Sequence, residues 1–214
     1  MYRFEILLVA LLLVLFDKIF FADAQFFTKY IWSANMIFLG LASIGIFKEQ
    51  NFWLKWFRNI LLLLTVLVPI FFGLIAQNKL LLELALAVYA LYYSLILAEV
   101  LRQITKKSET DLSVIFGSIS GFLLLIVIAL FAFLILEYNV PKSFNGITGK
   151  TIPELYNQLS YFAMVTLTTV GYGDITPATD SARLTVMFFT IVGQFYMVAL
   201  VGIIISRFTS SKNE

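Results

Sequence analysis

The residues best suited to chemistry form one short run, TTVGYGD, at positions 168–174. A potassium ion gives up hydration water only where oxygen atoms replace that water, and successive backbone carbonyls aimed at one axis can do so. Gly171 and Gly173 can take left-handed dihedrals that β-branched residues avoid, so alternating them with Val170 and Tyr172 can turn successive carbonyls inward. The Thr169 hydroxyl would add an inner ring of ligands. The run therefore indicates a backbone site for a dehydrated cation.

The composition argues against enzymatic chemistry. The chain contains no cysteine and no histidine. This removes disulfides, the commonest zinc ligands, thiol nucleophiles and the side chain that most often exchanges protons near neutral pH. A net charge of +2 is too small to suggest a polyanion-binding surface. We expect no enzyme activity, no catalytic residue, no cofactor beyond permeant potassium ions, and no nucleic-acid partner.

The elements that must position this run belong to a membrane protein. Of the 214 residues, 61% are hydrophobic and only 13% are charged, and the mean hydropathy is +0.94. A membrane-spanning helix needs about 20 mostly apolar residues. Reading for that length predicts spans at 2–21, 30–47, 56–76, 80–101, 112–138 and 181–208. A further apolar stretch, 155–167, is too short to cross a bilayer.

The short stretch has the features of a pore helix that leads into the run. Residues 151–154, Thr-Ile-Pro-Glu, form a capping box with proline in the first turn, which is the signature of a helix start. A helix from there to Leu167 would aim its partially negative C-terminus at the run and favour a cation. One chain supplies only one strand of such a site, so we expect a ring of four identical subunits.

The TTVGYGD run resembles the signature of the potassium channel family. The resemblance implies that the carbonyls of Thr169, Val170, Gly171 and Tyr172, with the Thr169 hydroxyl, bind potassium ions, and that Gly173 lies at the outer mouth. It implies supporting roles for the flanking Thr168 and Asp174. The similarity covers roughly 112–208 and includes Pro177, Arg183 and Gly193, of which Gly193 is a candidate hinge for gating. Gly202 is expected to be a packing glycine.

Two departures from the family pattern affect the support of the filter. Tyr161 and Phe162 stand where many relatives carry tryptophan, and Val165 replaces an acidic residue of some small bacterial channels. Neither phenylalanine nor valine can hydrogen-bond a carboxylate. We therefore expect Asp174 to lose partners, the clamp behind the filter to weaken, and inactivation to change.

The order of spans resembles that of six-helix channels in which a four-helix module precedes the pore. The expected fold is all-α, with six transmembrane helices and a re-entrant pore helix and filter between the fifth and sixth. We assign 1–107 to the four-helix module and 108–214 to the pore domain. Residues 80–97 of the fourth span contain no Lys or Arg, and steep voltage dependence needs several moving charges per subunit. The prediction is passive potassium conduction without steep voltage gating.

The remaining charges indicate the orientation. Basic residues favour the cytoplasmic side, and nine fall on the side of both termini against six on the other. The nine are Arg3, Lys48, Lys55, Arg58, Arg102, Lys106, Lys107, Arg207 and Lys212; the six are Lys18, Lys29, Lys79, Lys142, Lys150 and Arg183. We expect cytoplasmic termini and residence in the cell membrane. Glu83 and Glu99 are interpreted as structural, with Glu99 three residues before Arg102.

Several alternatives remain open at this stage. Arg3, the apolar run 6–16 and Ala22-Asp23-Ala24 mimic a cleavable secretory signal. A weakly selective cation channel, an uptake transporter subunit and a non-conducting auxiliary subunit are the competing functions. The sequence names no activating stimulus, and it leaves room for an unidentified regulatory partner.

Overall fold

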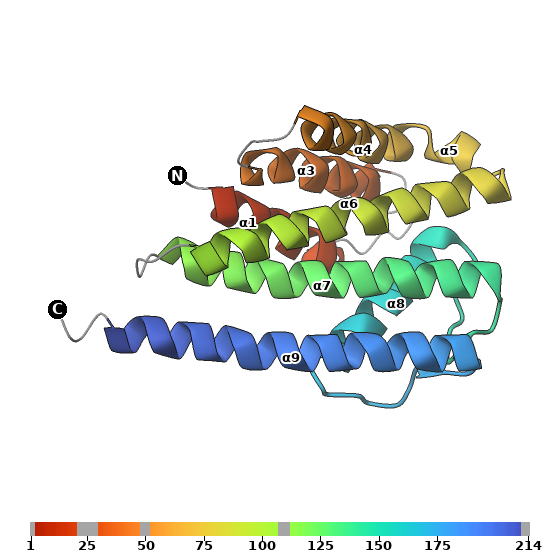
Figure 1. Ribbon diagram of the computed structural model, residues 1–214. Helices are drawn as coiled ribbons and strands as arrows, with labels where there is room; N and C mark the ends of the chain where they lie inside the picture. Colours follow the sequence, from red (N-terminus) through yellow and green to blue (C-terminus); the bar gives the residue numbers. More distant parts are fainter. Residues whose placement is uncertain (1–2, 21–29, 48–51, 107–111, 211–214) are drawn as a thin grey trace.

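The computed structural model describes residues 3–20, 30–47, 52–106 and 112–210, and most of this length is helical (Figure 1). Two short strands, β1 (Phe144–Asn145) and β2 (Thr176–Pro177), pair antiparallel, with Phe144 opposite Pro177. The helices are α1 (Arg3–Phe16), α3 (Trp32–Ala42), α4 (Phe52–Ile70), α5 (Phe72–Ile75), α6 (Lys79–Lys106), α7 (Leu112–Asn139), α8 (Ile152–Leu167) and α9 (Asp180–Ser210), with 3-10 turns η1 (Asp17–Phe20) and η3 (Ser43–Ile46).

Every predicted span coincides with helix, but three helices among the described residues are long and apolar enough to cross a membrane. These are Lys79–Thr105, Ser113–Asn139 and Asp180–Leu200, and Ser33–Ile46 is a shorter apolar helix. The first span changes from α-helix to a 3-10 turn at Asp17, and the third contains Pro69 and is interrupted at Phe71. The protein is therefore a mostly helical membrane protein, while the count of six crossings stays a prediction.

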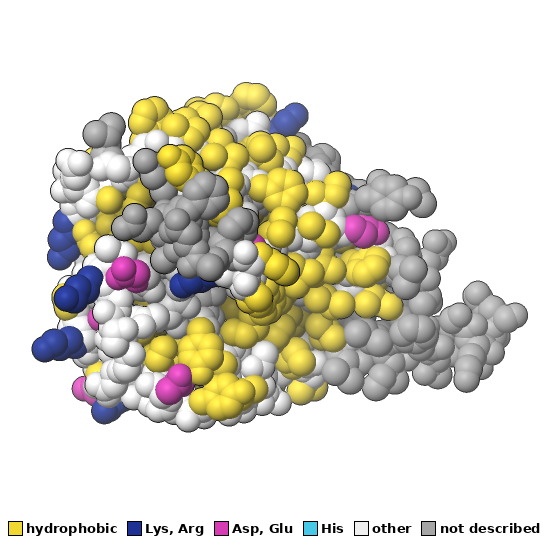
Figure 2. Space-filling model, turned by 180° about the vertical axis from the view of Figure 1, so that it is seen from behind, with side chains coloured by type: hydrophobic (Ala, Val, Ile, Leu, Met, Phe, Trp, Pro, Cys, Tyr) yellow, Lys and Arg dark blue, Asp and Glu magenta, His cyan; other side chains and the backbone are white. Residues whose placement is uncertain are grey.

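The long helices run side by side (Figure 1). α3 contacts α1 and α4, α6 lies against α4 and α7, and α8 fills the angle between α7 and α9. The first described turn of α1 and the last of α9 lie at the same end (Figure 1). Figure 2 shows an apolar middle, with Lys and Arg gathered at the end where α7 stops and α9 begins.

Three buried tyrosines lie on α6, and two of them, Tyr89 and Tyr93, stack on Phe131 of α7. Tyr89, Tyr92 and Tyr93 of α6 are fully buried. The Tyr89 hydroxyl donates to the Thr65 carbonyl at 3.1 Å, and the Tyr92 hydroxyl lies against that of Ser43. These bonds satisfy polar tips that burial would otherwise penalise.

The charges of α6 are paired at its two ends. Lys79 lies 3.8 Å from Glu83, and Arg102 lies 2.9 Å from Glu99. The local pairing expected for Glu99 is thus confirmed, and Glu83 also has a partner one turn away. Between Lys79 and Arg102 the helix carries no Lys or Arg.

α7 is the helix around which the others pack, since most of its side chains from Leu123 to Leu134 are buried. Its contact with α9 depends on Gly121. The Tyr196 hydroxyl donates to the Ser118 carbonyl at 2.8 Å, and a Cβ at position 121 would lie 2.1 Å from that hydroxyl. Only glycine leaves room for the tyrosine there.

Some predictions fall on positions outside the described residues. The proposed boundary between the four-helix module and the pore domain, at residues 107 and 108, is one of these. The division into two domains therefore stays a prediction. The same holds for the candidate cleavage site at 22–24 and for four of the counted lysines, Lys29, Lys48, Lys107 and Lys212. The side chains of Trp32 and Trp53 are not described either.

Candidate functional site

The pore helix begins as the capping box predicts. α8 starts at Ile152, directly after Thr151, with Pro153 in its first turn. The Glu154 carboxylate accepts the backbone N–H of Lys150 at 2.8 Å and of Thr151 at 3.2 Å. These hydrogen bonds, the one from Lys150 above all, hold the pKa of Glu154 below its ordinary value. The helix entrance is thus fixed by its own side chains.

The backbone after α8 alternates between two conformations. The φ angles are +64° at Thr169, +53° at Gly171 and +81° at Gly173. The left-handed dihedrals expected of the two glycines are therefore present, and Thr169 adopts the same conformation. A β-branched residue with positive φ is a clear outlier and costs about 1–3 kcal/mol. Three left-handed residues at every second position form a repeating backbone.

Hydrogen bonds to the last turn of α8 hold this repeat in place. The N–H of Thr169 donates to the Thr166 carbonyl at 3.0 Å, and the N–H of Gly171 donates to the Val165 carbonyl at 3.0 Å. The Thr168 hydroxyl donates to the Met164 carbonyl at 2.7 Å. Thr168 and Val165 were both expected to support the filter. Thr168 uses its hydroxyl, which bonds to α8, and Val165 uses its backbone carbonyl, which bonds to Gly171; no described bond joins either residue to Asp174.

The filter face is open in a single chain. A Cβ at Gly171 or Gly173 would meet no described atom within 4 Å, so the dihedral, and not crowding, requires glycine there. Val170 and Tyr172 are 53% and 72% exposed. The run Thr169–Gly173 therefore presents unpacked backbone and side chains at the surface of the chain.

Asp174 has a pore-helix partner, contrary to expectation. The Tyr161 hydroxyl donates to Asp174 Oδ2 at 2.8 Å, and the Tyr161 ring is stacked on Tyr172 with centroids 6.5 Å apart. Phe162 and Val165 donate no hydrogen bond to Asp174 in the described chain, as the sequence indicates, and the partner is the neighbouring phenol, which the prediction did not consider. A tyrosine hydroxyl can donate to a carboxylate, and that signal was available in the sequence.

Phe162 packs against aromatic residues of α7 and β1. Its ring is buried and lies 5.3 Å from Phe144 and 5.4 Å from Phe133, measured between centroids. Phe162 therefore anchors the pore helix to α7 and to β1. It supports the filter through packing and not through Asp174.

The segment after the filter is tied to the end of α7, a contact that no sequence pattern indicated. The buried Glu137 carboxylate accepts the N–H of Lys142 at 2.8 Å and of Phe144 at 3.0 Å. Beyond the filter, the N–H of Ala178 donates to the Ser143 carbonyl at 2.7 Å. Gly146, with φ of +82°, passes so near the filter that a Cβ there would lie 2.1 Å from the Asp174 carbonyl oxygen.

The other two family positions lie beside this segment. Pro177 is in β2, and its carbonyl accepts a 3.5 Å hydrogen bond from Arg183 Nε. Arg183 also lies 3.6 Å from Asp180 across an exposed first turn of α9. Both residues therefore brace the entrance to α9.

Gly193 and Gly202 differ in their surroundings. A Cβ at Gly193 would lie 3.2 Å from Leu167 Cγ, so this glycine lets α9 approach the end of the pore helix. Its role as a hinge stays a prediction. A Cβ at Gly202 would meet nothing within 4 Å in the described chain, so the described residues contain no partner for the packing expected there.

One face of α9 is apolar and uncovered. Its side chains are each more than half exposed and recur at helical spacing, which places them along one stripe. We call this the α9 stripe; it comprises Leu184, Met187, Phe188, Ile191, Phe195 and Val198. An exposed apolar surface of this extent marks a membrane or protein contact.

The part of the chain that the structure describes contains no cluster of three or more His, Cys, Asp or Glu side chains that could hold a metal ion. Cation ligands in this region would have to come from backbone and hydroxyl oxygens.

The C-terminal part of the chain is similar to known proteins. Residues 122–210 match the model of a family described as ion channel. Two similar proteins are both from Oryza sativa subsp. japonica. Two pore potassium channel c is 44% identical over 54 residues, which is 25% of this chain and 11% of that protein. Two pore potassium channel b is 49% identical over 47 residues, which is 22% of this chain and 12% of that protein.

The chain thus spans only about a ninth of the length of the curated relatives it matches. No solved structure gives a significant match.

Proposed function

We propose that this chain is one subunit of a potassium-selective channel. The premise is that residues 122–210 match the ion channel family and that part of the chain is similar to potassium channels. That family is one of channels and not of enzymes. The channel conducts passively through a homotetrameric pore in the cell membrane. Its subunit has six crossings and cytoplasmic termini, and its gating is not steeply voltage-dependent.

The alternating backbone from Thr169 to Gly173 is the observation that carries this proposal. Left-handed residues at every second position let successive carbonyls face the same side, as a stacked set of potassium sites requires. The carbonyls of Thr169, Val170, Gly171 and Tyr172 and the Thr169 hydroxyl are the proposed ligands. α8 ends directly before them, so its partial negative charge favours a cation.

Two features support a ring of four subunits. One chain contributes a single filter strand, and potassium ions need oxygens on all sides. The α9 stripe, Val170 and Tyr172 are all exposed in one chain, and neighbouring copies around a cyclic axis would cover them. Re-entrant backbone is tolerated at membrane depth only when it is buried in protein or lines water.

The charge distribution in α6 supports weak voltage dependence. Its basic residues lie at the two ends, and Arg102 is held by Glu99 at 2.9 Å. A voltage sensor moves about 3–4 charges per subunit through the membrane field. α6 has none at mid-helix to move.

Flux through purified protein in liposomes tests the proposal. We expect potassium flux that is blocked by barium, far smaller sodium flux, and loss of flux in Gly171→Ala because alanine is strained at positive φ. Gly73→Ala is the matched control, since a Cβ there would meet nothing within 4 Å and no positive φ is involved. Cross-linking of both variants to tetramers checks that assembly is intact.

The other outcomes separate the rival functions. Comparable sodium and potassium flux would favour a weakly selective cation channel. An assembled protein without flux of either ion would favour an auxiliary subunit.

A further inference from the structure

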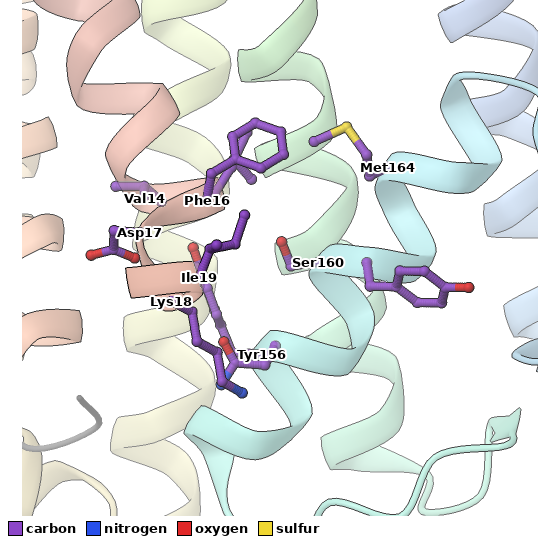
Figure 3. A pocket seen from close by; sticks show the side chains of 11 residues that line it. Val14, Phe16, Asp17, Lys18, Ile19, Tyr156, Ser160 and Met164 are labelled. Carbon is purple, nitrogen blue, oxygen red and sulfur yellow. The ribbon is translucent and has the colours of Figure 1, made fainter. Parts of the chain in front are cut away.

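A pocket of about 280 Å³ lies between the end of the first helix and the back of the pore helix (Figure 3). One wall is formed by the last turn of α1 and by η1. The other wall is the face of α8 that carries Tyr156, Ser160 and Met164, spaced four residues apart. Asn157 and Tyr161 of the same helix also line the pocket, so the pocket borders the side chain that contacts Tyr172.

The two ends of this pocket differ in chemistry. Lys18 and Tyr156 lie at one end, Phe16 and Met164 lie at the other, and Ser160 is between them (Figure 3). The Lys18 side chain is exposed and has no ion pair with any residue in the described ranges. The pocket is thus an apolar slot with a cation at its mouth.

The neighbouring carboxylate does not neutralise this cation. Asp17 is buried and also lines the slot, but its carboxylate is turned away from Lys18 in Figure 3. There it accepts a hydrogen bond from the Asn35 amide of α3. The charge of Lys18 is therefore left for another partner.

We propose that this slot binds a single-chain carboxylate, a fatty-acid anion whose head group pairs with Lys18 and whose chain lies along Phe16 and Met164. The charge complementarity selects an anionic head, and the apolar lining selects a hydrocarbon tail. The volume lies at the lower edge of the roughly 300–1,000 Å³ of small-molecule sites, which suits one acyl chain rather than a two-chain lipid.

The direction of binding follows from the order of residues along α8. Tyr156 lies near the start of the helix and Met164 near its end. In the proposed topology the start faces the outer surface, so Lys18 reaches toward the head-group layer. The same helix carries Tyr161, which contacts Asp174 and Tyr172, so a bound chain would press on the filter support from behind.

Photolabelling of the full chain in nanodiscs tests the proposal, and its readout does not depend on conduction. The probe is hexadecanoate with a diazirine at mid-chain, and adducts are located by mass spectrometry of peptides. We expect saturable labelling of 14–19 and 156–164. Lys18→Gln should raise the half-saturating concentration about fivefold, as the loss of a partly exposed charge-assisted contact does. Lys150→Gln, another exposed lysine near the start of α8, is the matched control and should leave labelling unchanged.

Two further probes define what would overturn the proposal. The methyl ester of the probe should label these peptides far less, and vesicles of phosphatidylglycerol should not protect them. Labelling spread evenly over the exposed faces of α1 and α9, or pocket labelling unchanged in Lys18→Gln and with the ester, would refute an anionic-chain site. Full protection by phosphatidylglycerol would refute the single-chain assignment.

Discussion

The hydroxyl of Tyr161 donates a 2.8 Å hydrogen bond to Asp174 Oδ2, and so joins the pore helix to the residue just beyond the filter. The Tyr161 ring is also stacked on Tyr172, with only 2° between the ring planes. One side chain thus contacts two consecutive parts of the outer filter.

Tyr161→Phe should weaken this support while the ring stack stays. We expect sustained potassium current to fall about threefold to tenfold relative to peak current, because a hydrogen bond to a charged group is lost. Single-channel recording in bilayers measures the ratio. Tyr138→Phe is the control, since no described hydrogen bond involves its hydroxyl. Equal currents in Tyr161→Phe and the wild type would show that the bond does not stabilise the filter.

Gly121→Ala should destabilise the packing of α7 against α9. The added Cβ would lie 2.1 Å from the Tyr196 hydroxyl, and overpacking of this kind costs about 1–3 kcal/mol. Thermal unfolding in detergent should show a lower midpoint, and Gly73→Ala should not. Tyr196→Phe removes the clashing oxygen, so the double variant should recover part of the loss. If the double variant lost as much stability as the two single variants added together, a direct contact between positions 121 and 196 would be contradicted.

Gly193→Ala distinguishes close packing from a hinge. A Cβ at this position would lie 3.2 Å from Leu167 Cγ. This distance is shorter than an ordinary contact, so the Leu167 side chain would have to shift. We expect a reduced open probability that Leu167→Val partly restores, because the smaller side chain makes room. Open probability in planar bilayers is the measurement. A loss that Leu167→Val leaves unchanged would favour bending of α9 at the glycine.

Acid should loosen the start of the pore helix through Glu154. Backbone hydrogen bonds, first from Lys150, lower the pKa of this carboxyl from its ordinary value of 4.5. A lowered folded-state pKa means that the stabilisation is present above 4.5 and is lost as pH falls through the folded-state pKa. Flux in the wild type should therefore drop at acid pH. Glu154→Ala should have a lower flux at neutral pH and should lack this part of the decline in acid. Parallel curves of flux against pH in the two proteins would contradict the assignment.

Conductance should respond only weakly to voltage. Arg102 is paired with Glu99 at the end of α6, so we expect the apparent gating charge to stay far below the roughly 3–4 charges per subunit of a voltage sensor. Conductance measured against voltage gives this slope. Arg102→Gln should leave the slope unchanged, and a shallower slope in that variant would identify Arg102 as a moving charge.

Local patterns in the sequence predicted the parts of the fold that local interactions determine. The capping box places the start of α8, and glycine in alternation gives the left-handed dihedrals of Gly171 and Gly173. The helical segments follow from runs of apolar residues. In each case, the relevant atoms lie within a few residues of one another along the chain.

Contacts between distant residues were not predictable in the same way. Tyr196 bonds to a carbonyl 78 residues away, and Gly146 passes beside Asp174 across the outer loop; no local pattern brings these pairs together. Thr169 violates the preference of β-branched residues because hydrogen bonds to the end of α8 fix its conformation. The regular α-helix is shorter than the predicted spans at Asp17, where a 3-10 turn begins, and at Phe71, two residues after Pro69.

The exposed α9 stripe has a consequence for cells that make two versions of this subunit. In the proposed ring of four, every subunit would contribute one wall of the same ion pathway, so a single defective copy would be enough to block conduction. If normal and Gly171→Ala chains are made in equal amounts and mix at random, only about one ring in sixteen contains normal chains alone. The defect would therefore be inherited as dominant, although half of all the chains are sound.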